Sequence, residues 1–427
     1  MLSGKNTDYL LLSLFGIVFC ISFYINFSNE PRAYFHDLRN RIVGTRLLKQ
    51  DTSIYFYKWN PSQPLTLYDP YDRCNIRNNM ITSPPSLLFL MQPAADLSYA
   101  AIARLWTVLH YLFFLLTVAF MYAYAIRTPA RRLVLLAACL LLFSDHWRDS
   151  VFRGQSHFLF PAIIAAMLWI TSRQIRYNFF YAGLLFALLV WLRPIAIIIT
   201  PFLFLSKETR SRQLLAGLTS GGALLALITA ASGQVPHWID YYHSCREWVR
   251  INTSGLVTTG CNHLKVVEGK VVNFGADANR LVWQSEIVDI FHLAKAKLQT
   301  SINAAYLLVL FALAYAGALL LCYKKLVQAF SRAILAGILL YWFSEMTAPV
   351  LKMSYYYVEL FVVVLFFAGR YYLLNLTQKT LLAASLLFTF LPFVPMNLTI
   401  AEFCTAACIL ITLLQRAPAS HDIPVRY

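Results

Sequence analysis

The stretch YLLLSLFGIVFCISFYINF, residues 9–27, contains no charged side chain, and neither does LWTVLHYLFFLLTVAFMYAYAI, residues 105–126. A helix of about 20 apolar residues crosses the hydrocarbon core of a bilayer. Both stretches reach this length, so each predicts a membrane-spanning helix. The first stretch is longer than the apolar region of a signal peptide, and no small-residue cleavage site follows it, which predicts a retained anchor.

The composition of the whole chain agrees with a membrane protein. Of its 427 residues, 59% are hydrophobic and 13% are charged, whereas about a quarter of the residues in soluble domains are charged. The net charge is +16, but the basic residues form short clusters between apolar blocks. This distribution is typical of cytoplasmic loops under the positive-inside rule, and it does not indicate a nucleic-acid-binding surface.

The basic clusters also predict the path of the chain through the bilayer. Lys and Arg near residues 127–132, 173–176, 207–212 and 324–332 place these loops in the cytoplasm. Further apolar blocks lie at residues 133–144, 156–172, 177–192, 194–206, 214–231, 302–323, 333–350, 355–369, 380–394 and 397–415. We therefore predict an all-α, polytopic helical bundle of about 11–13 spans. It forms a single transmembrane domain (1–427) with both termini cytoplasmic, and residues 416–427 form a cytoplasmic tail.

Two long polar stretches, residues 28–85 and 232–300, then fall on the extracytoplasmic side, and we expect short amphipathic helices in them. The second is rich in His, Trp and Tyr, which suit either sugar stacking or anchoring at the membrane interface. Cys245 and Cys261 lie in this second stretch. A bridge between them would require an oxidising, extracytoplasmic location, and the sequence leaves this pairing open.

The first polar stretch carries a candidate catalytic carboxylate, Asp37, soon after the first apolar block. A carboxylate held near the membrane surface can act as a general base toward an acceptor hydroxyl, and the neighbouring His36, Arg39 and Arg41 would tune its pKa. The alternative is that Asp37 caps a helix or faces water, as most loop aspartates do.

A second candidate cluster lies between two apolar blocks, at residues 144–157. Arg148 and Arg153 are suited to neutralising phosphate oxygens. Gly154-Gln155 at a helix start would direct backbone N–H groups toward an anion. The alternative is a charged loop whose side chains pair with one another.

Ionisable residues also occur inside the apolar blocks, where they indicate a functional site. Arg193 is one, although its side chain can also extend toward the membrane surface. Glu345, Lys352 and Glu359 recur every seven residues, which on a continuous helix would place them close to one face, unless Pro349 breaks the helix. They would face a polar cavity that binds phosphate or sugar, or form a buried ion-pair network that fixes helix packing.

The order of several short elements along residues 1–375 carries a resemblance to a known family. These elements are Phe35-His36-Asp37, Thr82-Ser83-Pro84-Pro85, Arg104-Leu105-Trp106, Arg153-Gly154-Gln155, Arg193-Pro194 and the segment 347–357. The ordered set resembles the GT-C superfamily of membrane glycosyltransferases, and within it family 87, the polyprenol-phosphate-mannose-dependent mannosyltransferase type. Where that family often carries a His-Tyr pair, this chain has Tyr355-Tyr356-Tyr357, and Lys352 is the candidate substitute for the histidine.

The resemblance implies a multi-pass enzyme of the cell envelope or plasma membrane. It would transfer a hexose, with mannose the first candidate, from a polyprenyl-phosphate donor to a lipid or glycan acceptor at the extracytoplasmic face. The reaction would invert the anomeric configuration, with Asp37 as the general base. The donor-binding residues implied are Arg148, Arg153, Gln155, His157, Arg193, Lys352 and Tyr356, supported by His36, Arg39 and Glu345.

We expect no cofactor, metal or nucleic-acid partner, because the sequence contains no phosphate-binding glycine loop, no dinucleotide fingerprint and no Asp-x-Asp pair in the first polar stretch. Two other classes of membrane protein remain as alternatives. One is a transporter or flippase of lipid-linked sugars, and the other is an O-antigen-type polymerase or ligase.

Overall fold

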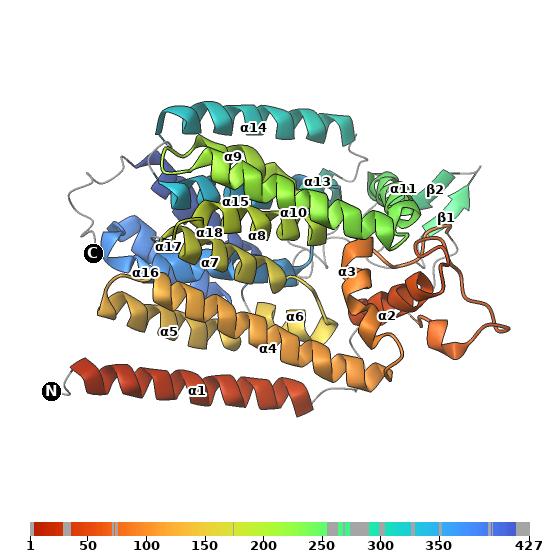
Figure 1. The fold of residues 1–427 in the computed structure, drawn as a ribbon, viewed down its shortest axis with the longest axis horizontal. Coiled ribbons are helices and arrows are strands. Elements are labelled where there is room, and N and C mark those ends of the chain that lie inside the picture. Colours follow the sequence, from red (N-terminus) through yellow and green to blue (C-terminus); the bar gives the residue numbers. More distant parts are fainter. Residues whose placement is uncertain are drawn as a thin grey trace.

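The computed structural model describes the chain in thirteen stretches. They comprise residues 4–28, 36–70, 72, 76–173, 175–253, 264–267, 270–273, 290–298, 304–325, 329–349, 352–391, 394 and 396–415. The described chain is a helical bundle with one antiparallel hairpin, formed by strands β1 (Leu264–Val267) and β2 (Lys270–Asn273) (Figure 1). The predicted all-α class is therefore confirmed.

Most of the longer helices run side by side along one direction and form the bundle (Figure 1). Its elements are α1 (Gly4–Ser28), α4 (Tyr99–Tyr124), α5 (Thr128–Leu142), α7 (Leu159–Thr171), α8 (Asn178–Leu192), η3 (Pro194–Ile199), α9 (Thr200–Leu205), α10 (Ser211–Ala231), α14 (Ala304–Lys325), α15 (Phe330–Thr347), α16 (Phe361–Gly369), η6 (Tyr371–Leu373), α17 (Leu376–Phe388) and α18 (Asn397–Leu414). Each predicted apolar block thus coincides with a helix or a pair of helices.

Four helices of the described chain are long and apolar enough to cross a membrane. They cover Asn6–Ser28, Tyr99–Tyr124, Ser211–Ala231 and Asn397–Leu414. Helix α1 also exposes large apolar side chains, such as Leu10 and Ile17 at 59% and 58%. A contiguous apolar surface of this kind needs a nonaqueous partner, and lipid supplies one. The chain is therefore a membrane protein.

Helices α8 and α10 pack so closely that two glycines are required at their contact. A Cβ atom at Gly217 would lie 2.0 Å from the carbonyl oxygen of Phe180, and one at Gly183 would lie 2.4 Å from the carbonyl oxygen of Leu214. Small residues at helix contacts allow backbones to approach and gain van der Waals energy in lipid, where no hydrophobic effect drives association.

We expect Gly217→Ala to force α8 and α10 apart and to lower the free energy of unfolding by about 3 kcal/mol, the upper end for overpacked sites. Thermal unfolding in detergent measures this loss. Gly222→Ala on the same helix is the matched control, because a Cβ atom there meets nothing within 4 Å. Equal melting temperatures for the two variants would contradict the close packing.

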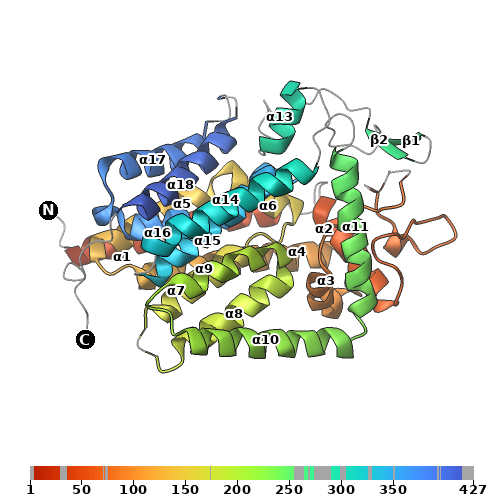
Figure 2. The same ribbon diagram turned by 90° about the horizontal axis from the view of Figure 1, so that it is seen from above.

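The two predicted polar stretches fold together over one end of the bundle (Figures 1 and 2). We call this region the cap. It consists of α2 (His36–Lys49), η1 (Leu65–Leu67), α3 (Pro85–Met91), η2 (Gln92–Ala94), α11 (Val235–Thr253) and the β1–β2 hairpin. Helix α11 runs across the direction of the bundle helices (Figure 2), and α13 (Ile290–Leu298) follows the hairpin in sequence. The short helices expected in both stretches are present.

Polar side chains link the two halves of the cap. Asn78 donates to the backbone carbonyl of Ser244 on α11 at 3.0 Å, and the rings of Tyr55 and Tyr241 lie 5.4 Å apart. The Tyr55 hydroxyl donates to the backbone carbonyl of Ser83 at 2.7 Å. Segments separated by more than 150 residues therefore form one polar layer at the end of the apolar bundle. Which face of the membrane it occupies stays a prediction.

Candidate active site

Asp37 lies in the first turn of α2, where the cap meets the bundle, and its side chain is half-buried. The side-chain amide of Gln155 donates to Asp37 Oδ2. The amide oxygen of the same Gln155 accepts from Arg41 Nη2 at 2.8 Å. Gln155 therefore links the carboxylate to the guanidinium one helical turn further along α2.

Arg41 is a buried cation that joins three segments of the chain. Its Nε donates to Ser83 Oγ at 2.9 Å, just before α3, and its Nη1 donates to the carbonyl of Gly154 at 2.6 Å. Burial lowers the pKa of the Arg41 guanidinium, and the charge of Asp37 opposes this shift. Because each of its three nitrogens is bonded, Arg41 fixes the orientation of α2 and hence the position of Asp37.

Gly154 ends a helix, which corrects the expectation that Gly154-Gln155 would start one. The preceding segment forms α6 (Asp145–Arg153), and Gly154 caps it with a left-handed φ of 66°. The N–H groups of Gly154 and Gln155 donate to the carbonyls of Val151 and Ser150, at 3.0 and 2.9 Å. These two N–H groups are therefore already bonded to backbone carbonyls. It is the side chain of Gln155 that contacts the site, through Asp37 and Arg41.

Two tyrosines of the 3-10 helix η5 (Ser354–Leu360) form an aromatic wall next to His157 and Arg153. The ring of Tyr356 lies 4.1 Å from that of His157, and the Arg153 guanidinium lies 5.7 Å from the ring centroid of Tyr355. Gln155, which bonds to Asp37, lies between Arg153 and His157 in the sequence. The carboxylate, the cations and the aromatic wall therefore belong to one site.

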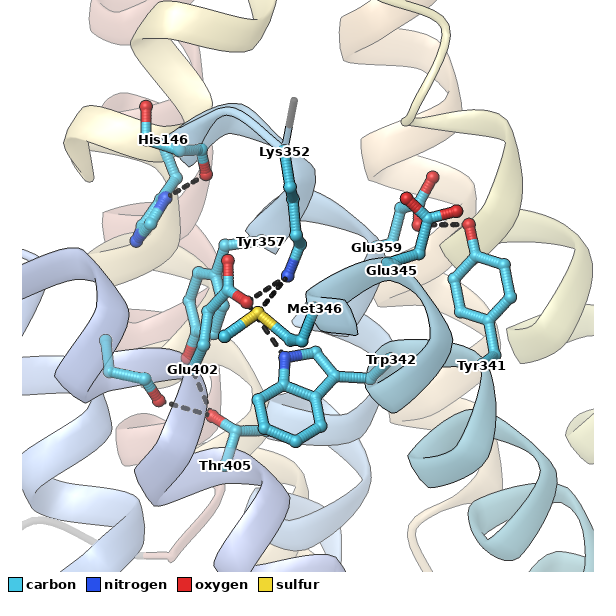
Figure 3. A network of polar contacts seen from close by, with 12 residues as sticks. His146, Tyr341, Trp342, Glu345, Met346, Lys352, Tyr357, Glu359, Glu402 and Thr405 are labelled. Atoms are coloured by element: carbon cyan, nitrogen blue, oxygen red, sulfur yellow. Dashed lines mark hydrogen bonds and ion pairs between the residues drawn. The ribbon is translucent and has the colours of Figure 1, made fainter. Parts of the chain in front are cut away.

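Arg193 lies next to this wall in a partly buried ion-pair network, with its side chain 24% exposed. Its guanidinium is 5.2 Å from the ring centroid of Tyr356, and its Nη2 lies 3.1 Å from Glu359 Oε1 and 3.6 Å from Glu345 Oε1. Figure 3 shows the two carboxylates next to each other beside Tyr341. The arginine supplies positive charge to the buried Glu359 and the partly buried Glu345.

Tyr341 and His157 complete the hydrogen bonds of Glu359. The Tyr341 hydroxyl accepts from Arg193 Nε at 2.8 Å and donates to Glu359 Oε2 at 2.6 Å. Nδ1 of His157 lies 2.6 Å from Glu359 Oε1. The Glu359 side chain is only 4% exposed, so both of its oxygens are satisfied, as a buried carboxylate requires.

The seven-residue spacing does not lie on one continuous helix, because α15 ends at Thr347 and Pro349 follows. Glu345 and Glu359 nevertheless converge on Arg193 from either side of this break. Lys352 pairs instead with Glu402 of α18. The helix break that the sequence left open at Pro349 thus separates Lys352 from the two glutamates, and the contacts form an ion-pair network.

Three of the expected site residues, two for donor binding and the supporting Arg39, are engaged away from Asp37. Arg148 is 69% exposed and donates to Asp145 at 2.7 Å. Arg153 Nε likewise donates to Asp149 at 2.7 Å, so both arginines match the self-pairing alternative. Arg39 donates to the carbonyl of Tyr68 at 3.0 Å, and Lys352 is held by Glu402. The expected roles of Arg148 and Lys352 in donor binding, and of Arg39 in support, stay predictions. The side chain of His36 and residue Cys261, whose pairing with Cys245 the sequence left open, lie outside what the structure describes.

Sequence reasoning missed Tyr341 and Glu402. Glu402 is a lone carboxylate in the apolar block 397–415. Because an ionisable residue at such a position is a functional candidate, the sequence could have predicted it. Tyr341 lies among apolar residues and gave no such signal. Within the described residues, no three His, Cys, Asp or Glu side chains come together as a metal site requires.

Comparison with known families identifies the protein class. The family model of glycosyltransferase family 87 matches residues 82–344, which is more than half of the chain. The chain belongs to glycosyltransferase family 87. No curated protein gives a significant match.

The matched segment of this family 87 glycosyltransferase contains Gln155, His157, Arg193 and Tyr341, which form one side of the site. Asp37 lies before that segment and η5 lies after it. The complete site therefore combines a family-matched centre with two flanking segments that the fold brings to it. A half-buried carboxylate beside several cations is suited to removing a proton near a phosphate.

Because Gln155 holds both Asp37 and Arg41, we expect Gln155→Leu to lower kcat/KM for sugar transfer about 100-fold, the effect of a displacement of about 1 Å in a reacting group. Initial rates of the purified variant measure this loss. Gln213→Leu serves as the control, since Gln213 bonds to Arg176 elsewhere in the chain. A Gln155 variant with more than half of the normal kcat/KM would show that the bridge is dispensable.

Proposed function

We propose that this glycosyltransferase transfers a hexose from a polyprenyl-phosphate donor to a hydroxyl of a lipid or glycan acceptor, with inversion, at the extracytoplasmic membrane face. The observation that carries the proposal is the convergence of Asp37 from the polar cap with Arg41, Arg153 and Arg193 at the end of the apolar bundle. A lipid carrier holds its phosphate at the boundary between apolar and polar layers, which is where these groups meet.

In the proposed reaction, Asp37 accepts the proton of the acceptor hydroxyl. The acceptor oxygen forms a bond to the anomeric carbon from the face opposite the phosphate. The bond between that carbon and the phosphate oxygen breaks, and polyprenyl phosphate leaves with the electron pair, so the anomeric configuration inverts. A general base of this kind contributes about 10²- to 10⁴-fold to the rate.

The arginines would stabilise the negative charge that grows on the departing phosphate. Fixed donors of positive charge in a site with little water lower such a barrier strongly, and guanidinium groups match phosphate oxygens in geometry. Tyr355 and Tyr356 offer a flat aromatic wall for a sugar ring or the phosphate. Mannose is the first candidate for the sugar because the sequence resembles the mannosyltransferase type of this family.

The protein purified in detergent tests this proposal when it is supplied with a membrane lipid extract and one donor at a time. The donors are polyprenyl-phosphate mannose, other polyprenyl-phosphate hexoses and a lipid-diphosphate oligosaccharide. Release of polyprenyl phosphate and formation of a glycosylated product are measured, and NMR of the product reports its anomeric configuration. We expect transfer from a monophosphate donor with inversion.

Each alternative predicts a different result in this assay. Transfer only from the lipid-diphosphate donor would support a ligase or polymerase. Movement of labelled donor across proteoliposomes without release of polyprenyl phosphate would support a flippase. Retention of the anomeric configuration would overturn the mechanism, since a single displacement at the anomeric carbon must invert it.

A further inference from the structure

The helix η5, which carries Tyr355, Tyr356 and Glu359, is bonded to the C-terminal helices α17 and α18. Its first anchor is the Lys352–Glu402 ion pair just before η5, where Lys352 is 3% and Glu402 0% exposed. Trp342 Nε1 also donates to Glu402 Oε2 at 2.8 Å. Figure 3 shows Lys352, Trp342 and Met346 gathered around the Glu402 carboxylate.

The second anchor lies within η5 itself. The hydroxyl of Tyr357 bonds to Thr405 Oγ1 at 2.9 Å and to Ser385 Oγ, and these two hydroxyl groups lie 2.7 Å from each other. Ser385 belongs to α17 and Thr405 to α18. Tyr357 is fully buried, so this trio ties the middle of η5 to both C-terminal helices.

A third anchor comes from α6. Burial lowers the pKa of His146 to about 3, so its imidazole is neutral near pH 7. Nδ1 of His146 lies 2.6 Å from the backbone carbonyl of Ser354. Because a carbonyl oxygen can only accept, Nδ1 carries the proton and donates it to this bond. The start of η5 is thus fixed by α6 as well.

These anchors matter because η5 has little stability of its own. A 3-10 helix has poorer hydrogen-bond geometry than an α-helix, and Pro349 separates this one from α15. Residues 352, 354 and 357 are bonded to other elements, while Tyr355, Tyr356 and Glu359 contact the site. The position of the aromatic wall therefore depends on tertiary contacts made by its neighbours in sequence.

We propose that Lys352 and Glu402 are positioning residues for the donor site, and that the mutual neutralisation of their buried charges keeps Tyr355 and Tyr356 against His157 and Arg153. The proposal rests on the proposed sugar transfer for its kinetic effects. It assigns the C-terminal helix α18, which lies outside the family-matched segment, a part in the active site. It also replaces direct phosphate binding by Lys352, whose ammonium group is already neutralised by Glu402.

Variants Lys352→Met, Glu402→Gln and their combination test the proposal in the purified full-length protein. Each single change leaves one buried charge without its partner, which displaces η5, whereas the combined change removes both charges at once. We expect each single variant to raise the donor KM roughly tenfold, with kcat changed less than about threefold. We expect the combined variant to return both the donor KM and the melting temperature toward the original values.

The exposed pair Lys49–Asp96 provides the matched control, with the variants Lys49→Met, Asp96→Asn and their combination. Exposed ion pairs contribute little, so these variants should keep the donor KM. A raised donor KM in the combined Lys352 and Glu402 variant, with its melting temperature restored, would show that the Lys352 charge meets the donor, and would overturn the proposal. Single variants with lower melting temperatures but an unchanged donor KM would also overturn it.

Two further measurements keep the test decisive. If the single variants fail to fold, Tyr357→Phe loosens η5 more gently, and an unchanged donor KM in that variant overturns the proposal. If the original protein uses no polyprenyl-phosphate donor, the proposed function fails but the positioning role is still decided by cryo-EM of Glu402→Gln. Separation of the Tyr356 and His157 rings beyond 4.1 Å supports the role, and an unchanged separation overturns it.

Discussion

Asp37→Asn is expected to lower kcat for sugar transfer by about 10²- to 10⁴-fold while the donor KM stays within about threefold. The asparagine side chain has the size of aspartate and keeps an oxygen that can accept from Gln155. Its amide has no significant basicity, however, so it cannot take the proton of the acceptor hydroxyl. The loss should therefore appear in the chemical step and leave donor binding almost unchanged, as initial rates at varied donor concentration will show.

The control for this experiment is Asp96→Asn, which makes the same change on an exposed carboxylate paired with Lys49. Both variants should melt within a few degrees of the original protein, so that any loss of rate reports catalysis. If Asp37→Asn retains more than a tenth of the original kcat, another group removes the proton and the assignment of Asp37 fails.

Arg193→Met is the second change with a large expected effect, because it leaves Glu345 and Glu359 facing each other without their shared cation. Removing one partner of a buried ion pair costs about 3–5 kcal/mol. We expect a correspondingly lower melting temperature in detergent, together with loss of sugar transfer. Arg193→Lys keeps the charge but not the planar guanidinium. Its melting temperature and its rate of sugar transfer should therefore lie between those of the original protein and of Arg193→Met.

A combined variant separates the two roles of Arg193. Adding Glu359→Gln to Arg193→Met removes one of the two carboxylates that shared this cation, so part of the lost stability should return. Sugar transfer should remain low, because the guanidinium that we propose to stabilise the departing phosphate is still missing. Recovery of transfer together with stability would show that Arg193 serves only to neutralise the carboxylates.

The sequence predicted the helical elements well, because each bundle helix is a charge-poor apolar block bounded by polar or basic residues. It also identified Asp37, Gln155, His157, Arg193 and Tyr356, which the structure brings into one site. Burying a polar group next to a membrane-spanning block costs free energy, so a polar residue at such a position is a candidate for function. Local patterns made some of them candidates, and the resemblance to family 87 selected the set.

The partners of these residues could not be predicted in the same way. Lys352 was expected to share a face with Glu345 and Glu359, but the chain turns after Thr347 and directs it to Glu402, 50 residues further along. Arg148 pairs within its own helix, and its expected role in donor binding stays a prediction. Gly154 was expected at the start of a helix and instead ends one. The end of the helix at Gly154 and the break after Thr347 are places where the backbone turns, which depends on contacts distant in sequence.

The assembly of the site has a consequence for biosynthesis. Asp37 bonds to Gln155, 118 residues later, and His157 bonds to Glu359 after a further 202 residues. At 5–20 residues per second, the roughly 320 residues from Asp37 to η5 take roughly 15–60 s to synthesise. During that interval the chain already contains Asp37 and Arg41 but does not yet contain Tyr355 and Tyr356. A chain that ends before residue 352 lacks η5 and the partner of His157, so we expect sugar transfer only from chains that extend beyond η5.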